Sequence, residues 1–384
     1  MRILFLIPNM AMGGAQRIMA ALVNHVSETH ETALAVLDSE KTPEFFGVHP
    51  IVRRYYLDRL GGRGIRRVLR ILSRLKKIRA VHRAFKSDIV VSFMDTMNTT
   101  TIIALWKCNV PVIAAERTDP SSNSIGCLRG WLRNLTYRYA TVVVQTSRIA
   151  EYFARRGVGA EIISNPVFKS DLMAATHLPG SDGRFRIVVC GRLSHEKRIP
   201  LIIDAFSLLA LRFPAWDLLI LGDGPQRQDI ECQIAKQSLG NRVILAGMVS
   251  DIQAAMARCH INAFISIYEG FPNALAEAMA LGLPSVACRD VSGVEELALD
   301  QQTGLLVDRE PSAYEVAAKL EALMKNPSLR QQLALAARSH ILHWSPDLIF
   351  SKWDRLFDKI ADTQGRLRIE GHLAASSHLS PADQ

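Results

Sequence analysis

The sequence lacks the cysteine spacings that hold metals or structural disulfides. It has only six cysteines in 384 residues, none in a C-x-x-C pair, and several stand within apolar, strand-like runs. Isolated cysteines in such runs are typical of reduced core residues, so we expect neither a metal centre nor a disulfide framework, and a cytoplasmic protein. The six are Cys108, Cys127, Cys190, Cys232, Cys259 and Cys288.

Long apolar segments are also missing. No run reaches the roughly 20 residues that a membrane-spanning helix needs. The apolar run at residues 4–7 is short and is followed by Pro8, Gly13 and Gly14, which is unlike a signal peptide. We therefore expect a soluble or peripheral protein. With 384 residues, 48% of them hydrophobic, the chain is long enough for two domains with sizeable cores.

Acidic residues are scarce in one segment. Residues 53–86 contain thirteen Lys and Arg but a single acid, Asp58, so this segment is net +12 although the whole chain is only +9. The remainder is therefore slightly acidic, at about −3. The basic charge belongs to one patch and not to a general surface for polyanions.

Short runs rich in Val, Ile and Leu alternate with helix-like stretches along most of the chain. One series predicts strands at residues 2–8, 32–37, 88–93, 111–116 and 141–145. A second series predicts strands at 186–190, 218–221, 242–246, 261–266, 284–287 and 304–307. Nearly continuous apolar strands between helices favour parallel sheets covered on both faces, and therefore an α/β protein with two Rossmann-like domains.

A polar connection separates the two series. Asn165-Pro166 and the Pro- and Gly-containing stretch 178–183 predict a hinge at 166–184, between domains at 1–165 and 185–342. Ligands of such sheets bind at the carboxyl ends of the strands, so two facing domains predict one central cleft. Aromatic residues predict closing helices at 343–362, and the polar composition of 363–384 predicts a disordered tail.

Two loops after predicted strands have residues suited to phosphate. The first strand leads into Gly13-Gly14 and an amphipathic helix, whose N-terminus presents free N–H groups; a tight turn without a ligand is the alternative. In the second half, Gly191-Arg192 precedes Lys197 at another strand end. Two cations there would neutralise a diphosphate, and a solvated basic loop is the alternative.

The most informative stretch is 264–284. Glu269 and Glu277 are separated by seven residues, and Pro272 between them predicts that Glu269 lies in a strand-end loop and Glu277 in the first turns of a helix. Both carboxylates would then face the cleft, where they suit sugar and ribose hydroxyls, while the helix N-terminus offers N–H groups to phosphate. The alternative is that these acids serve only the helix dipole.

In this order, the motifs resemble those of the family-four glycosyltransferases, which are retaining enzymes of the GT-B fold, over residues 1 to about 360. The motifs are the glycine loop, Gly191-Arg192 to Lys197, the turn-like Gly222-Asp223-Gly224, Glu269-x(7)-Glu277 and the stretch 304–308. The resemblance implies two Rossmann-like domains facing a central cleft. It also implies a hexosyltransferase whose donor is a nucleotide-sugar, by default a UDP-sugar, with no obligatory cofactor or metal.

The resemblance also implies roles for individual positions. Arg192 and Lys197 would hold the donor diphosphate, Glu277 the ribose hydroxyls and Glu269 the hydroxyls of the transferred sugar. Catalysis would rest on Glu269, Arg192 and Lys197, mainly by stabilising the departing nucleotide diphosphate. The remaining donor-binding residues would be Gly14, Gly191, Gly270, Phe271, Pro272, Asn273, Ala274 and Leu275.

One position departs from the family pattern. Many relatives carry a His after the fourth strand of the N-terminal domain, whereas this chain has Glu116-Arg117, which is similar to a variant found in bacterial polysaccharide and lipid-linked oligosaccharide transferases. Glu116 and Arg117 are therefore candidates for contact with acceptor or donor. Asp95, after the third strand, is a further cleft candidate, with a helix cap as its alternative.

Residues 64–86 place apolar side chains at helical spacing between Arg and Lys residues, which predicts a basic amphipathic helix. Such a helix suits an anionic membrane surface, and an ordinary domain helix with a solvated charged face is the alternative. Together with the resemblance, it favours a glycan or lipid-linked acceptor in bacterial surface polysaccharide synthesis. We then expect a peripheral protein on the inner face of the bacterial inner membrane.

Two other functions fit parts of the pattern. A nucleotide-sugar epimerase of the same fold would turn over the donor without any acceptor. A non-enzymatic nucleic-acid-binding protein would use the basic helix, but the chain has no recognised nucleic-acid-binding motif and its positive charge is confined to one segment. We therefore expect no nucleic-acid partner.

Overall fold

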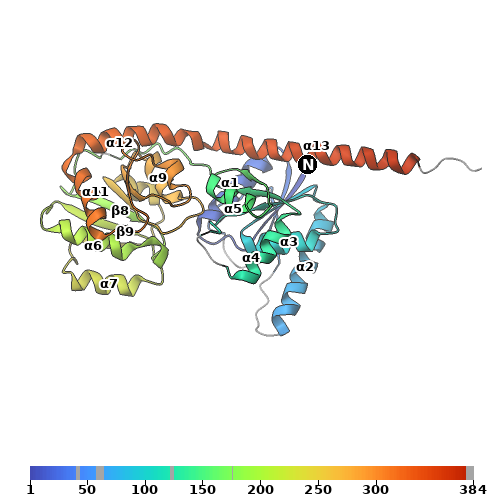
Figure 1. The fold of residues 1–384 in the computed structure, drawn as a ribbon, viewed down its shortest axis with the longest axis horizontal. Helices are drawn as coiled ribbons and strands as arrows, with labels where there is room; N and C mark the ends of the chain where they lie inside the picture. Colours follow the sequence, from blue (N-terminus) through green and yellow to red (C-terminus); the bar gives the residue numbers. More distant parts are fainter. Residues whose placement is uncertain (40–43, 58–64, 122–124, 175, 378–384) are drawn as a thin grey trace, which may run out of the picture.

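The computed structural model describes residues 1–39, 44–57, 65–121, 125–174 and 176–377, and only the backbone of 65–70 and 365–377. This part of the chain forms two α/β lobes side by side, and one long C-terminal helix runs across both (Figure 1). The prediction of two parallel-sheet α/β domains is confirmed.

The N-terminal domain contains a parallel sheet with the strand order β3-β2-β1-β4-β5-β6-β7. Its strands are β1 (Arg2–Ile7), β2 (Glu31–Val36), β3 (Arg53–Tyr56), β4 (Ile89–Phe93), β5 (Val112–Ala115), β6 (Thr141–Val144) and β7 (Ala160–Ile162). Its helices are α1 (Gly14–Ser27), α2 (Ile65–Phe85), α3 (Asp95–Leu105), α4 (Cys127–Tyr137) and α5 (Ser147–Ala154). The unpredicted strands, β3 and β7, are the two edge strands. Both are partly exposed and lack the continuous apolar run that marks a central strand.

The C-terminal domain contains a second parallel sheet with the order β10-β9-β8-β11-β12-β13. Its strands are β8 (Phe185–Cys190), β9 (Trp216–Leu221), β10 (Val243–Gly247), β11 (Ile261–Phe264), β12 (Ser285–Cys288) and β13 (Leu305–Val307). All six coincide closely with predicted strands. Its helical elements are η1 (His195–Lys197), α6 (Ile199–Ala210), α7 (Arg227–Lys236), α8 (Ile252–Ala257), α9 (Asn273–Ala280), α10 (Val294–Leu297), α11 (Ala313–Lys325), α12 (Pro327–His340) and η2 (Ile341–Trp344).

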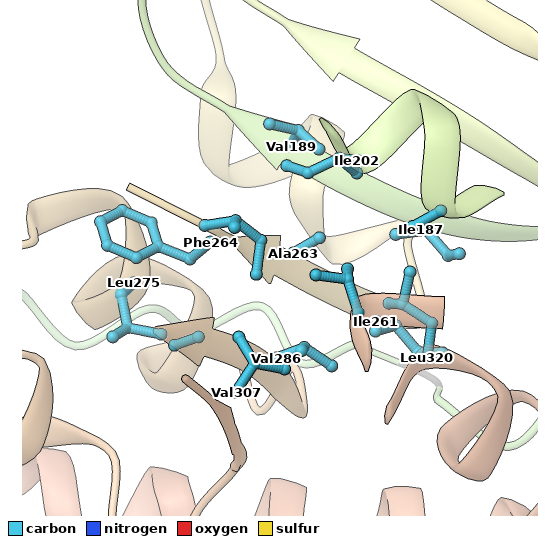
Figure 2. Close-up of a cluster of buried hydrophobic side chains, with 14 of the residues drawn as sticks. Ile187, Val189, Ile202, Ile261, Ala263, Phe264, Leu275, Val286, Val307 and Leu320 are labelled. Carbon is cyan, nitrogen blue, oxygen red and sulfur yellow. The ribbon is translucent and has the colours of Figure 1, made fainter. Parts of the chain in front are cut away.

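The core of the C-terminal domain shows why its strands were predictable from their apolar runs. Figure 2 shows side chains of neighbouring strands, among them Val189, Ala263 and Val307, packed together with Ile202 of α6 and Leu320 of α11. Three of these side chains, Ile202, Val307 and Leu320, have no measurable exposure, and Ala263 and Val189 are 1% and 5% exposed. Because the strands have helices on both faces, residues pointing either way are apolar.

The strand order places a topological switch point at the centre of each sheet. In the N-terminal sheet β1 pairs with both β2 and β4, and in the C-terminal sheet β8 pairs with both β9 and β11. Chains that leave the carboxyl ends of such a strand pair pass to opposite sides of the sheet, which leaves a crevice between them. The loops after β1, β4, β8 and β11 are therefore the places to look for a ligand site.

The last helix returns to the N-terminal domain. After η2, α13 (Pro346–Ser377) places Ile349, Phe350, Trp353, Leu356 and Phe357 in the hydrophobic core around β1 and β4. The prediction of a disordered tail is wrong for residues 363–377, which continue α13, while 378–384 lie outside the described residues. Residues 363–377 contain no proline and several good helix formers, so they extend a helix that the docked part has already nucleated.

Helix α2 confirms the helix predicted at 64–86, but only some of its apolar side chains are buried. Ile78, Val81 and Phe85 are buried and belong to the core on one face of the N-terminal sheet, whereas Ile71 and Leu72 are exposed. The second half of α2 is thus an ordinary domain helix with a charged outer face. None of the helices in the described ranges has an apolar stretch long enough to cross a bilayer.

Candidate active site

The central feature of the site is an ion pair between the loops that follow β8 and β11. Lys197 closes the short helix η1, and its Nζ pairs with Oε1 of Glu269. The ammonium group also lies 5.4 Å from the centre of the Phe264 ring. The side chains of Lys197 and Glu269 are only 20% and 15% exposed, so both charges are largely removed from water and depend on each other.

The turn at Gly222-Asp223-Gly224 fixes the loop that leads to Lys197. A Cβ atom at Gly222 would lie 2.0 Å from the carbonyl oxygen of Gly191, and one at Gly224 would lie 2.5 Å from the carbonyl oxygen of Leu193. Glycine is therefore required at both positions for the two loops to touch backbone to backbone. The structure gives these glycines the structural role that their turn chemistry predicts.

The N-terminus of α9 lies beside the ion pair and opens onto a cavity between the domains. The C-terminal domain lines this cavity with the loop 268–271 and Asn273, together with Glu196 and Lys197. The N-terminal domain lines it with Gly14, Ala15, Arg117, Thr118, Gln145 and Asn165. The cavity measures about 230 Å³. Seven predicted residues meet here: Gly14, Arg117, Lys197, Glu269, Gly270, Phe271 and Asn273.

Glu277 lies one helical turn after Asn273 and faces the other domain. Its carboxylate pairs with Arg17, on the first turn of α1, although 260 positions separate the two residues. Burial raises the pKa of Glu277 above its usual value, and the neighbouring Arg17 guanidinium acts in the opposite direction. Arg17 itself lies 5.7 Å from the centre of the Phe168 ring.

The two domains touch closely around the cavity. A Cβ atom at Gly270 would lie 2.2 Å from the carbonyl oxygen of Arg117, and one at Gly14 would lie 2.8 Å from Nδ2 of Asn273. The Nδ2 atom of Asn165 donates a hydrogen bond of 2.8 Å to Oδ1 of Asn273. The glycines of both predicted loops thus allow the two sheet edges to approach each other.

Arg117 is the only cation of the N-terminal domain among the described residues that line this cavity. Its guanidinium is buried over the Phe93 ring at 3.9 Å, and Nη1 donates to Oδ1 of Asn165 at 2.9 Å. Its Nε and Nη2 atoms are buried and have no hydrogen-bond partner in the part of the chain that the structure describes. Burial lowers the pKa of Arg117 to about 9, although the nearby Glu116 carboxylate partly opposes this.

Glu116 points into the N-terminal domain and does not line the cavity. Its fully buried carboxylate accepts hydrogen bonds from the backbone N of Arg117, from Oγ1 of Thr118 and from the hydroxyl of Tyr137, each 3.0 Å long. Burial raises its pKa, and the positive charge of Arg133 partly offsets that effect. Glu116 is therefore placed to hold the loop after β5 in position.

The structure sets several other predicted residues apart from the cavity. Asp95 begins α3 and pairs with Arg129 at 3.5 Å, consistent with its alternative role at a helix end. Arg192 is exposed, and within the described ranges its side chain forms no ion pair or hydrogen bond, although its carbonyl oxygen accepts from the backbone N of Ser194 at 2.9 Å. Leu275 is buried in the core of the C-terminal domain, so only its backbone, like that of Ala274, is a candidate for ligand contact.

Six residues that line the cavity were not predicted as site residues, and neither was Arg17, which lies outside its lining. The six are Ala15, Thr118, Gln145, Asn165, Glu196 and Tyr268. Gln145 directly follows β6, and a polar amide just after a buried strand is a usable signal. Asn165 comes three residues after β7, an exposed edge strand that gives no such signal. Arg17 follows the predicted glycine loop by three positions, yet its contact with Glu277 depends on how the domains face each other. Tyr268 adjoins Glu269 and resembles any other strand-end aromatic residue.

Comparison with known proteins agrees with this arrangement. Residues 178–340 match the family model described as glycosyl transferases group 1. The chain is 26% identical over 369 residues to the GalNAc-alpha-(1->4)-GalNAc-alpha-(1->3)-diNAcBac-PP-undecaprenol alpha-1,4-N-acetyl-D-galactosaminyltransferase of Campylobacter jejuni, covering 94% of this chain and 99% of that protein. It is 25% identical to a second Campylobacter jejuni protein, N-acetylgalactosamine-N,N'-diacetylbacillosaminyl-diphospho-undecaprenol 4-alpha-N-acetylgalactosaminyltransferase, over 83% of this chain and 89% of that one.

Solved structures show the same fold. Anabaena HepE in complex with UDP superposes with a TM-score of 0.75 at 18% identity, covering 94% of this chain and all of that one. The lipopolysaccharide outer core galactosyltransferase WaaB superposes with a TM-score of 0.73 at 17% identity and the same coverage. Residues 178–340 therefore form a group 1 glycosyl transferase domain, and the chain is a glycosyltransferase with the two-domain GT-B fold.

Proposed function

We propose that this protein transfers a hexose or N-acetylhexosamine from a nucleotide-sugar, with a UDP-sugar as the first choice, to a glycan on a lipid-linked acceptor. The setting would be the synthesis of a bacterial surface polysaccharide, and the sugar would keep its anomeric configuration. In support, both Campylobacter jejuni relatives are named after an undecaprenol-linked glycan, and the structure of HepE was solved with UDP.

The observation that carries the proposal is the Lys197–Glu269 pair beside the N-terminus of α9. When the bond to a nucleotide diphosphate breaks, negative charge accumulates on the leaving oxygen. The ammonium of Lys197 and the free N–H groups at the start of α9 are both suited to neutralise that charge. A diphosphate that binds Lys197 would also release the Glu269 carboxylate, which then accepts hydrogen bonds from hydroxyls of the transferred sugar.

Glu277 and Arg192 complete the donor site in this proposal. Glu277 would accept hydrogen bonds from the ribose hydroxyls, which requires its carboxylate to share or leave Arg17. Arg192 is exposed and has no ion-pair partner among the described residues, so its guanidinium is free to bind the same diphosphate. Gly14 and Gly191 would allow the backbone to approach the donor closely.

In the N-terminal domain, Arg117 is the candidate for direct contact with substrate. Arg117 lines the cavity, two of its buried nitrogens have no hydrogen-bond partner among the described residues, and an anionic or hydroxyl oxygen would satisfy them. Glu116 and Asp95 are proposed to position this side of the cleft, since their carboxylates are engaged within the domain.

Membrane association and domain motion belong to the same proposal. Lys76 and Arg83 on α2 are exposed and would attract an anionic bilayer to a peripheral, cytoplasmic protein.

Gly270 and Gly14 leave little room at the contact between the domains. The domains would therefore have to move apart, and residues 166–184 would act as the hinge for this motion. The donor would enter when the domains are apart.

The test is a transfer assay with a panel of UDP-sugars and bacterial membrane extract, comparing the wild type with Glu269→Ala and Arg192→Ala. The matched control is Glu231→Ala, an exposed acid on α7 of the same domain. We expect one UDP-sugar to support transfer, with loss in both site variants and not in the control. Conversion of the donor without acceptor would indicate an epimerase, and failure of every donor to bind or react would refute the proposal.

A further inference from the structure

Helix α4 exposes apolar side chains along one stripe. Leu128, Trp131 and Leu135 stand at positions i, i+3 and i+7 and are 76%, 60% and 37% exposed. The polar residues Arg133 and Thr136 are buried on the opposite face. A single exposed leucine is ordinary, but three large apolar side chains in one helical stripe form a continuous surface of the kind that marks an interaction site.

Packing within the domain explains the inner face of α4 but not its outer face. Arg133 donates from Nη2 to the hydroxyl of Tyr152 at 3.0 Å, and Tyr137 at the end of the helix donates to Glu116. These polar contacts fix the rotation of the helix. They place no demand on the residues that face outward, which in an isolated soluble protein would be polar.

The segment of the chain that contains the α4 stripe is positively charged. Residues 120–150 contain four arginines and no acid, and Arg129 and Arg138 are exposed beside the stripe. Helices α2 and α4 both pack against α3, and in Figure 1 both lie on the lower side of the N-terminal lobe. Exposed Lys76 and Arg83 of α2 add to the positive charge. Leucine and tryptophan bordered by basic residues match an anionic lipid surface in both polarity and charge.

The α4 stripe also begins near the ligand-binding edge of the sheet. Arg129, in the first turn of α4, pairs with Asp95, which stands two residues after the last residue of β4. Leu128 therefore stands at the end of α4 that is closest to the cleft, and Leu135 lies farther from it. A surface that contacts α4 would lie beside the entrance for an acceptor.

We propose that Leu128, Trp131 and Leu135 enter the interfacial layer of an anionic bilayer and hold the cleft at its surface. This inference deepens the proposed function and rests on it for the lipid-linked nature of the acceptor. The apolar contact with the membrane is made by α4, whereas α2 supplies charge, because from Ile78 onward its apolar side chains are buried in the domain.

The first test uses the intrinsic fluorescence of Trp131. The full-length protein is mixed with vesicles of phosphatidylcholine alone, or of equal parts phosphatidylcholine and phosphatidylglycerol, with and without bromine-labelled acyl chains. We expect a blue shift and bromine quenching with the phosphatidylglycerol vesicles, and loss of the quenched component in Trp131→Phe. Unchanged emission of the wild type would overturn the inference.

The second test removes the stripe and keeps the reporter. The variant with Leu128→Gln and Leu135→Gln should bind phosphatidylglycerol vesicles roughly tenfold or more weakly, because two leucines lose their apolar burial. The matched control carries Leu211→Gln and Leu335→Gln, which change two exposed leucines of the C-terminal domain. Equal vesicle binding by both double variants would overturn the inference. The inference would also be overturned if the wild type self-associates, the α4 variant is monomeric, and both bind vesicles equally.

These outcomes are distinct from those of the transfer assay. Vesicle binding is measured without donor or acceptor, so a protein that inserts Trp131 but transfers no sugar would refute the proposed function alone. A protein that glycosylates a lipid-linked acceptor while Trp131 stays in water would refute only the membrane role of α4.

Discussion

The two sheets have the same central strand order, yet the polar residues at their carboxyl ends are used differently. In the C-terminal domain, Lys197 and Glu269 turn toward the cavity between the domains. In the N-terminal domain, the carboxylates of Glu116 and Asp95 are engaged by Tyr137 and Arg129 within their own domain. Equivalent topology therefore predicts where a site lies but not which sheet supplies its charged groups. Here the C-terminal sheet supplies most of them.

The largest expected effect is the difference between two variants, each of which changes one carboxylate near the carboxyl ends of one sheet. Glu269→Gln should lower transfer about 100-fold to 1,000-fold, since it removes a charged group of the cavity and the partner of Lys197. Glu116→Gln should leave transfer within a few-fold of the wild type. Measured kcat/KM values for the two variants test this difference directly, and equal losses would contradict the contrast between the two sheets.

The contact between the sheets is tested at Gly270. Gly270→Ala places a Cβ against the Arg117 backbone, which cannot move aside as a flexible side chain would. We expect the domains to remain farther apart and transfer to fall about tenfold to 100-fold. Small-angle X-ray scattering would report the change in shape. The control is Gly240→Ala, where a Cβ meets nothing within 4 Å; matching scattering and activity in the two variants would argue against a required closure.

A smaller effect is expected at the ion pair between the domains, Arg17–Glu277. Burial raises the pKa of Glu277 and Arg17 opposes this rise, so Arg17→Ala should raise the pKa further. Glu277 would then become protonated at higher pH. The acid limb of the kcat/KM profile should move to higher pH, with a few-fold loss near neutral pH, and Arg17→Lys should largely restore it. An unshifted profile would show that Glu277 has no part in donor binding.

Glu116 should have the smallest effect on transfer, and its measurable effect is on the free energy of unfolding. Burial raises its folded-state pKa above the usual value of 4.5, so above that pH the folded protein holds a proton that the unfolded chain has lost. The stability of the wild type should therefore fall, relative to Glu116→Gln, as pH rises from about 4.5 toward the raised pKa. The slope should not exceed about 1.4 kcal/mol per pH unit. Urea unfolding across this range measures it, and parallel curves would contradict a raised pKa.

Much of the fold and the C-terminal part of the site could be predicted from sequence because their signals are local. The apolar runs mark central strands, and the order of strand, loop and helix places Lys197, Glu269 and the start of α9 at one sheet edge. The edge strands β3 and β7 were not predicted because an exposed strand shows no such run. The helical extension at 363–377 depends on a helix that tertiary packing has already formed.

The remaining features depend on contacts that no local pattern records. The pairs Arg17–Glu277 and Asn165–Asn273 exist only because the two domains face each other. Whether Glu116 turns toward the cleft or into the domain depends on Tyr137, which is 21 positions away. Helix α4 shows the same difficulty, since Leu128, Trp131 and Leu135 have the spacing of a core-facing stripe, and only the buried contacts of Arg133 show that they face outward.

The return of α13 to the N-terminal domain has a consequence for the order of folding during synthesis. The core around β1 and β4 is incomplete until Trp353 and Phe357 have left the ribosome, long after all of the C-terminal sheet has been made. The C-terminal domain is in effect an insertion within the N-terminal one. The domain that starts first is therefore finished last, and a chain cut short before α13 would leave the ribosome with an open apolar core and a complete second domain.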